Sequence, residues 1–194
     1  AAAAARAAAA VGYAGAGTFE FVVDDQGRPH FIEVNCRIQV EHPVTEMVTD
    51  VDLIREQILV AAGEPLGLRQ QDVAHRGVSI ECRVNAEDPE RRFTPTPAVV
   101  SEFVPPGGGF VRVDTHVYPG FRVGADYDSL LAKVVVWAAD RDQAIARMQR
   151  ALGEFRVSGH GLRTTVGFLG QVLAHPLFRD AKHTTGLVDG MLAD

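Results

Sequence analysis

The segment TFEFVVDDQGRPHFIEVNCRIQVEHPVTE, residues 18–46, decides the fold of the first part of this chain. Its runs 18–23 and 30–35 are rich in Phe, Val and Ile, and they flank the turn-forming residues 24–29. Short β-branched and aromatic runs on either side of a Gly-containing turn are typical of a β-hairpin. Two antiparallel strands are therefore predicted.

The polar side chains of this hairpin indicate a metal site. If Gln26 and Gly27 occupy the two central turn positions, with Gly27 at positive φ, Glu20 falls directly opposite Glu33. Asn35 then shares their face, because side chains alternate along a strand. Opposed carboxylates repel each other; a divalent cation would relieve that repulsion, and this all-oxygen set suits Mg²⁺ or Mn²⁺. The alternative is an ordinary hairpin with one solvated face.

The next residues indicate an anion site. Arg37, Gln39 and Glu41 alternate with apolar residues in a predicted extended segment that ends at His42, where Pro43 disfavours helical geometry. The three side chains should therefore project the same way. An Arg fork binds planar oxyanions, and a nearby carboxylate can accept a proton from the bound group. The alternative is a surface ion pair between Arg37 and Glu41.

Composition limits the classes of function. The chain has 194 residues, is 46% hydrophobic and carries a net charge of -6. It can bury one substantial core, and the absence of a basic stripe excludes nucleic acid and an anionic membrane surface as partners. No long apolar run predicts a membrane-spanning helix. Cys36 and Cys82 lack metal-ligand spacing and are too few for a disulfide framework, which favours a cytoplasmic location.

The order of predicted elements indicates an α+β fold in two parts. The first part, residues 1–63, contains the hairpin and a helix over 52–62 that begins at Asp50 or Asp52 and packs behind the hairpin. A polar segment over 64–76, broken by Pro65 and Gly67, is the predicted linker.

The second part, residues 77–194, is predicted to be mainly antiparallel sheet with two packed helices. Strands are expected at 78–85, 98–104, 110–116 and 130–137, and helices after Asp140 and over 164–173. The glycine run 105–109 is interpreted as a wide hairpin loop. Arg83 lies on the polar face of the first of these strands, where the alternative to a functional role is a solvated ion pair with Glu81 or Glu87.

Residues 31–46, FIEVNCRIQVEHPVTE, resemble the signature of biotin carboxylases, the ATP-grasp enzymes of acetyl-CoA, propionyl-CoA and pyruvate carboxylases. The fragment formed by Glu33, Asn35 and Arg37 occurs throughout the ATP-grasp superfamily, whereas the continuation 39–43 is far more specific. Further matches are found at 80–88, 126–130 and 141–148. The resemblance implies that residues 1–63 are the C-terminal part of an ATP-grasp domain and that 77–194 are a biotin carboxylase C-terminal domain.

The resemblance also implies a reaction. MgATP phosphorylates bicarbonate, the carboxyphosphate formed breaks down to CO₂ and phosphate, and deprotonated biotin on a carrier protein attacks the CO₂. ATP, Mg²⁺ or Mn²⁺, and biotin are the implied cofactors. The implied site residues are Glu20, Glu33 and Asn35 for the metals, Arg37, Gln39 and Val40 for bicarbonate, Glu41 for removal of its proton, and Arg83 for the biotin enolate.

The implied partners are a biotin carboxyl carrier protein, a carboxyltransferase and a second copy of the chain in a homodimer. The family's N-terminal domain, glycine-rich lid and phosphate-binding lysines lie upstream of this point, so the chain is expected to be a fragment that is inactive alone. Two alternatives remain: an ATP-grasp ligase that does not use biotin, and a non-catalytic dimerisation module.

Overall fold

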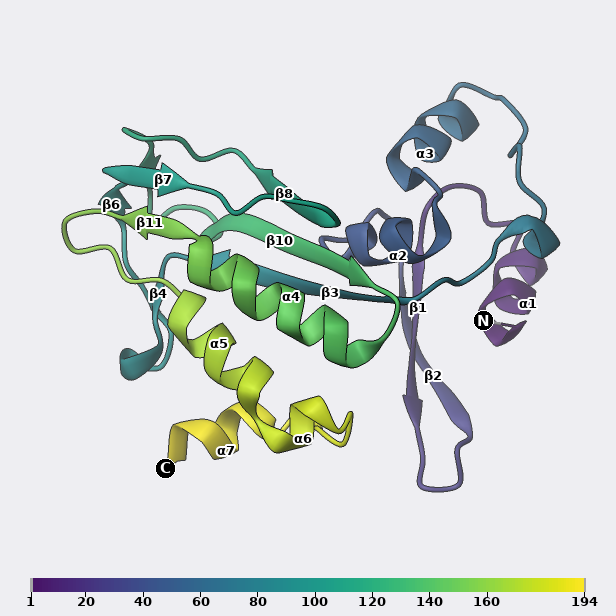
Figure 1. Cartoon of the computed structure of the whole chain (residues 1–194). Helices are drawn as coiled ribbons and strands as arrows, with labels where there is room; N and C mark the ends of the chain where they lie inside the picture. The colour runs from purple at the N-terminus through teal and green to yellow at the C-terminus, as the bar shows by residue number, and fades with distance from the viewer. Residues whose placement is uncertain (1, 194) are drawn as a thin grey trace. The chain divides into compact units, whose positions relative to one another are not determined.

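The computed structural model describes residues 2–193, and the chain divides between His75 and Arg76 into two compact units. The first unit contains a β-hairpin with flanking helices, and the second contains a sheet with helices packed on it (Figure 1). The division falls at the C-terminal end of the predicted linker, residues 64–76. Antiparallel sheets mixed with helices confirm the predicted α+β class.

In the first unit, β1 (Thr18–Val23) and β2 (Pro29–Asn35) form the predicted hairpin, and Glu20 pairs with Glu33. The predicted turn, with Gln26 and Gly27 as its two central residues, was wrong. The observed turn has three central residues, 25–27, because the Asp24 backbone N–H donates to the Arg28 carbonyl. Ile32 is then an extra residue that forms a bulge between the pairs 20–33 and 21–31 and restores the predicted register.

The Asp24 side chain explains this turn. Its Oδ1 accepts the backbone N–H groups of Gln26 and Arg28, both at 2.9 Å, which stabilises a three-residue loop. Gly27 closes the loop with a φ of 75°, a conformation in which glycine has no steric penalty.

After the hairpin, the predicted extended segment was also wrong near its end. Residues 40 and 41 form a turn, and α2 (His42–Thr49) begins at His42 with Pro43 in its first turn. Proline is accepted there because the first N–H groups of a helix have no intrahelical partner. Strict alternation therefore does not hold from Arg37 to Glu41.

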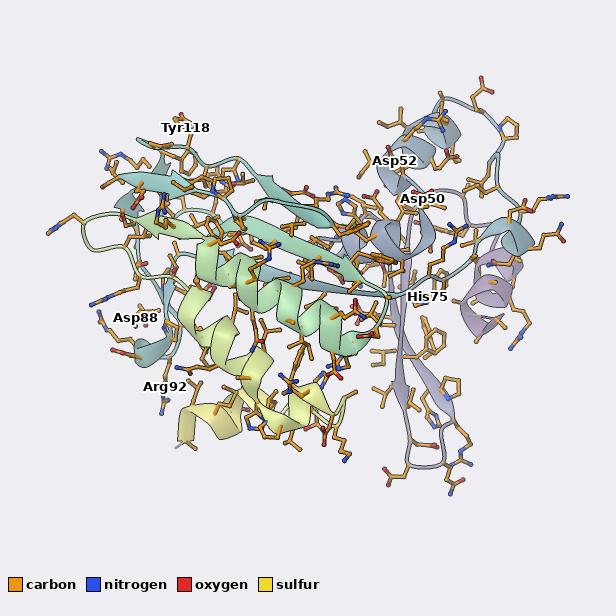
Figure 2. The ribbon with its side chains drawn as sticks, viewed as in Figure 1. Asp50, Asp52, His75, Asp88, Arg92 and Tyr118 are labelled. Carbon is orange, nitrogen blue, oxygen red and sulfur yellow. The ribbon has the colours of Figure 1, made fainter. Side chains whose placement is uncertain are left out.

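Two further helices belong to this unit. α1 (Ala2–Ala10) precedes the hairpin, and α3 (Leu53–Ala61) follows α2. Asp50 ends α2 in the left-handed conformation, and Asp52 caps α3 by accepting the N–H of Arg55 at 2.8 Å (Figure 2). The expected packing of α3 behind the hairpin is not found: among the described residues α3 has no buried side chain, and Ile58 is 61% exposed.

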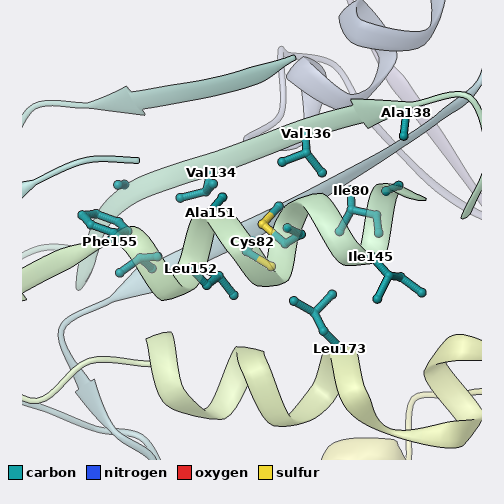
Figure 3. Close-up of a cluster of buried hydrophobic side chains, with 14 residues drawn as sticks. Ile80, Cys82, Val134, Val136, Ala138, Ile145, Ala151, Leu152, Phe155 and Leu173 are labelled. Atoms are coloured by element: carbon teal, nitrogen blue, oxygen red, sulfur yellow. The ribbon is translucent and has the colours of Figure 1, made fainter. Parts of the chain in front are cut away.

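The second unit is built on three antiparallel strands in the order β3-β10-β8. These are β3 (Val78–Asn85), β10 (Leu130–Ala138) and β8 (Val111–Thr115). α4 (Arg141–Glu154) begins at Asp140, whose carboxylate accepts the N–H of Gln143 at 2.9 Å. Its predicted apolar stripe is buried against one face of β3 and β10, where α5 (Val166–Ala174) adds Leu173 (Figure 3).

Short strands complete this unit in three separate pairs. They are β4 (Glu87–Asp88) with β5 (Thr94–Pro95), β6 (Ala98–Val99) with β9 (Arg122–Val123), and β7 (Glu102–Val104) with β11 (Arg156–Ser158). The single strand predicted over 98–104 is thus divided. The hairpin expected around the glycine run was wrong, because β7 pairs with β11 and β8 pairs with β10.

The chain continues into α6 (Pro176–Arg179) and α7 (Leu187–Ala193), for which no firm sequence prediction existed. Over residues 2–193, no helix has the length and apolar character needed to cross a membrane.

Candidate active site

Three predicted metal-binding side chains converge on one face of the hairpin. The Asn35 Nδ2 atom donates to Glu20 Oε1 at 2.8 Å and to Glu33 Oε1 at 3.1 Å. The amide N–H groups, whose hydrogens carry partial positive charge, thus bridge two carboxylates that face each other across the strands. The opposition of the two acids predicted from the sequence is therefore present.

This oxygen set fits a divalent cation. Across residues 2–193, no three His, Cys, Asp or Glu side chains gather as a metal-binding group. On this face, the two carboxylates are joined by Asn35, whose Nδ2 atom faces them. Two carboxylates and an amide oxygen are hard ligands that Mg²⁺ and Mn²⁺ accept. For Asn35 to be a metal ligand, its amide must turn so that Oδ1 and not Nδ2 faces the two carboxylates.

The residues after β2 offer groups for an anion. Arg37 is exposed, and its Nη1 donates to the carbonyl of Ile38 at 3.3 Å. The Gln39 Oε1 atom is buried and has no hydrogen-bond partner among the described atoms. A buried acceptor without a partner is costly, and a ligand hydroxyl, such as that of bicarbonate, would satisfy it. Glu41 is exposed and makes no capping bond to α2.

In the second unit, Arg83 projects from the face of β3 opposite the core. Its neighbours along the strand, Cys82 and Val84, are buried beneath α4, so the alternation predicted for this strand is confirmed. Arg83 Nε lies 3.5 Å from Glu81 Oε1, with the Arg83 side chain 49% exposed. The ion pair of the alternative interpretation is thus present. Glu87 instead bonds to Asn85 and Ser129.

A charged ladder that no local sequence pattern predicts lies beside Arg83. Lys133 on β10 is directly opposite Arg83 on one side and Asp114 on the other. Lys133 Nζ lies 3.4 Å from Asp114, which also binds Arg112 at 2.8 Å. Burial raises the pKa of the Asp114 carboxyl, but the hydrogen bonds and charges of Arg112 and Lys133 outweigh burial and hold that pKa below its ordinary value. The available signal was Lys133 itself, the single charge in an apolar strand.

A second polar network surrounds the end of β3. Asn85 Nδ2 and Ser129 Oγ both donate to Glu87 Oε1, at 3.1 and 2.5 Å. Thr165 Oγ1 donates to the Arg83 carbonyl at 3.2 Å and accepts the Asn85 N–H at 3.0 Å. Sequence reasoning missed Thr165, because 82 positions separate it from Arg83 and no local pattern marks it.

The second unit also contains a cavity of about 1020 Å³ between the 88–93 segment, α5 and α7. Asp88 and Arg92 lie on its 88–93 side (Figure 2). Its walls combine Phe93 and Phe168 with charged side chains of both signs. None of the predicted site residues lines this cavity.

Comparison with known proteins identifies the class. Residues 81–190 match the biotin carboxylase C-terminal domain, and residues 1–69 match the ATP-binding domain of the carbamoyl-phosphate synthase L chain. Curated relatives named biotin carboxylase in Nostoc sp. and biotin carboxylase 1 in Bacillus subtilis are each 50% identical to this chain, over 97% and 96% of its length. This chain belongs to the biotin carboxylase family.

Solved structures agree. The biotin carboxylase domain dimer of Hydrogenobacter thermophilus 2-oxoglutarate carboxylase, in complex with MgADP, ADP and bicarbonate, superposes with a TM-score of 0.93. It is 44% identical and covers 96% of this chain. The chain spans 41% of that protein and 42% and 41% of the two curated relatives. The predicted family and fold are therefore confirmed, whereas the individual site residues stay predictions.

Proposed function

We propose that this chain supplies the second half of a biotin carboxylase active site, which uses ATP and bicarbonate to carboxylate biotin on a carrier protein. The observation that carries the proposal is the convergence of Glu20, Glu33 and Asn35 on one hairpin face. This oxygen set lies immediately before Arg37 and the unsatisfied Gln39 acceptor, so a cation site and an anion site are adjacent in the chain.

The chemistry follows from these side chains. A divalent cation held by the hairpin oxygens would neutralise charge on the transferring phosphoryl group. Arg37, with Gln39 and the Val40 backbone, would hold bicarbonate, and Glu41 would accept its proton. The bicarbonate oxygen would then attack the γ-phosphorus of ATP, and ADP would leave. Carboxyphosphate would then release CO₂ and phosphate.

Arg83 has a separate role in this proposal. Deprotonated biotin carries negative charge on its ureido oxygen, and a guanidinium donor at that oxygen lowers the free energy of the enolate. The Arg83 side chain is 49% exposed and can be reached by a ligand, whereas the Glu81 side chain 3.5 Å away is only 6% exposed.

The partners are part of the same proposal. We infer a biotin carboxyl carrier protein, a carboxyltransferase and a homodimer, because a relative's biotin carboxylase domain is described as a dimer. A cytoplasmic location is inferred from two unpaired thiols, of which buried Cys82 has its pKa raised to about 12 by desolvation. The family match over 81–190 counts against an ATP-grasp ligase that does not use biotin.

The metal site provides the test. In the complete enzyme, Glu33→Gln removes one of two carboxylate ligands. The Mg²⁺ concentration for half-maximal bicarbonate-dependent ATP cleavage should rise by at least about tenfold, the lower end of what even outer-shell changes cause. Asp25→Asn removes a carboxylate from the hairpin turn and should leave the Mg²⁺ dependence unchanged. Equal Mg²⁺ dependence in both variants would contradict the metal role.

The dimerisation alternative needs its own measurement. Residues 1–194 alone should show no biotin-dependent ATP cleavage, whereas size-exclusion chromatography reports whether they self-associate. Turnover by this chain alone would contradict the proposal that it holds only part of the site.

A further inference from the structure

We propose that Thr165 is a positioning residue for Arg83. It holds the backbone that bears Arg83 by hydrogen bonding to the edge of β3 that has no neighbouring strand. The proposal rests on the role assigned above to Arg83. Thr165 is buried, with 5% of its surface exposed. A buried hydroxyl must be hydrogen-bonded, and all of its described bonds go to the strand that bears Arg83.

The contacts reproduce those of a neighbouring strand. In the three-stranded sheet β3 pairs only with β10, so its other edge has no strand beside it. Alternate residues of a strand present their N–H and C=O groups to the same edge. Thr165 Oγ1 donates to the Arg83 carbonyl, Oγ1 accepts the Asn85 N–H, and the Thr165 N–H donates to the Asn85 carbonyl at 3.1 Å. One residue thereby satisfies three successive groups of this edge.

These three hydrogen bonds from Thr165 lie at the end of β3 where its pairing with β10, along the other edge, is irregular. The pairing of β3 with β10 shifts register between Leu130 and Ala132, opposite Asn85 and Val84. The regular ladder thus ends one residue beyond Arg83. The regular ladder holds the rest of β3 in place. From Arg83 to Asn85, the hydrogen bonds of Thr165 take over part of this role.

The Glu87 network fixes the same strand end from the other side. Ser129 binds Glu87 through its hydroxyl, and its carbonyl accepts the Ala86 N–H at 2.8 Å. Asn85 joins the two networks, because its backbone bonds to Thr165 and its amide bonds to Glu87. The half-exposed Arg83 side chain extends from this braced backbone. A displacement of about 1 Å at a reacting group can cost on the order of a hundredfold in rate.

The test uses Thr165→Val, which keeps the shape and removes the hydroxyl, in the complete enzyme. Biotin carboxylation, expressed as kcat/KM for free biotin, should fall by about tenfold, a part of what full misplacement would cost. Bicarbonate-dependent ATP cleavage without biotin should not change. Thr165→Ser retains the hydroxyl and should restore biotin carboxylation.

The chain offers a matched control in Thr96. Thr96 Oγ1 donates to the Arg163 carbonyl at 2.9 Å and accepts the Arg163 N–H at 3.1 Å. Thr96→Val therefore removes an equivalent pair of bonds, but at Arg163, two residues before Thr165. It removes no side-chain bond to β3. It should leave the kinetics with biotin unchanged. Hydrogen exchange at the Asn85 amide should accelerate in Thr165→Val and not in Thr96→Val.

Arg83→Ser distinguishes failure of the positioning role of Thr165 from failure of the proposed function of Arg83. If Arg83→Ser lowers biotin carboxylation while Thr165→Val does not, the positioning role is wrong and the function stands. If Arg83→Ser has no effect, the proposed function is wrong at this residue. Thr165→Val added to Arg83→Ser should cause no further loss, because the two act on one step. Equal loss of both half-reactions in Thr165→Val, with a lower unfolding temperature, would show a purely structural role.

Discussion

Glu41 lies at the junction between a turn and α2, with its carboxylate exposed and not used to cap the helix. In the proposed function this carboxylate accepts the proton of bicarbonate. At the scale of the residue, the charge of Glu41 can be removed while the size and position of its side chain are kept.

Glu41→Gln in the complete enzyme should leave ATP binding nearly intact and lower bicarbonate-dependent ATP cleavage. The expected loss is roughly 10²- to 10⁴-fold, the contribution of a general base. Steady-state ATPase assays with and without bicarbonate measure it, and Glu64→Gln in the exposed segment after α3 is the control. Unchanged turnover in Glu41→Gln would return this residue to a structural role.

Arg83→Ser should separate the two half-reactions. Biotin carboxylation should fall by about a hundredfold, on the order of 3 kcal/mol, because a charged donor is removed from the proposed enolate site. ATP cleavage without biotin should survive. Glu81→Gln removes the charge of the partner in the observed ion pair, and urea unfolding measures the contribution of that pair to stability. Parallel loss of both half-reactions in Arg83→Ser would show that its role is wrongly assigned.

At the scale of the element, β3 and β10 depend on a glycine where the second unit begins. Gly77 has a φ of 63°, and a Cβ built there would lie 2.3 Å from the Ala138 carbonyl oxygen and 2.8 Å from the Trp137 ring. Trp137 is itself anchored, since its Nε1 donates to the Arg76 carbonyl at 2.8 Å. The strand end therefore has no room for a side chain at this position.

Gly77→Ala should destabilise the second unit. The left-handed conformation costs a non-glycine residue roughly 1–2 kcal/mol, and displacement of the β10 end adds to this cost. Urea unfolding measures the loss. Gly67→Ala is the control, because a Cβ built at Gly67 meets no neighbour within 4 Å and Gly67 has no positive φ. Equal unfolding midpoints for the two variants would contradict the close approach.

At the scale of the whole molecule, the two units differ in how much apolar surface they bury. Most buried hydrophobic residues belong to residues 76–194, in two clusters around β10. In the first unit the strands of the hairpin leave large apolar side chains exposed, such as Phe31 at 56% and Val23 at 61%. Burial of apolar area is the main source of folding free energy, so the units should differ in stability.

Residues 76–194 expressed alone should unfold cooperatively in urea, whereas residues 1–75 alone should show no cooperative transition. In the intact chain, amide exchange should be slowest in β3, β10 and α4 and fastest in β1 and β2. Mass spectrometry with peptide resolution provides the measurement. Comparable protection in the hairpin and in β10 would contradict this difference.

The sequence alone determined the elements whose signals are local. Alternation marked β3, a continuous apolar run marked β10, and the stripe of Ala144, Ile145 and Met148 behind Asp140 marked α4. Each follows from the period of a single element, 2 or 3.6 residues. The signature over 31–46 indicated the family, because the residue types at fixed spacing are specific to it.

Only the tertiary structure decided which groups meet. The Glu20–Glu33 pairing was predicted correctly, but it depends on a bulge at Ile32 that offsets a longer turn. The pairing of β7 with β11 and the bridge from Thr165 to Arg83 join residues more than fifty positions apart. Such contacts leave no periodic trace in the sequence, because each hydrogen-bonding edge can accept many partners and packing of the whole unit selects among them.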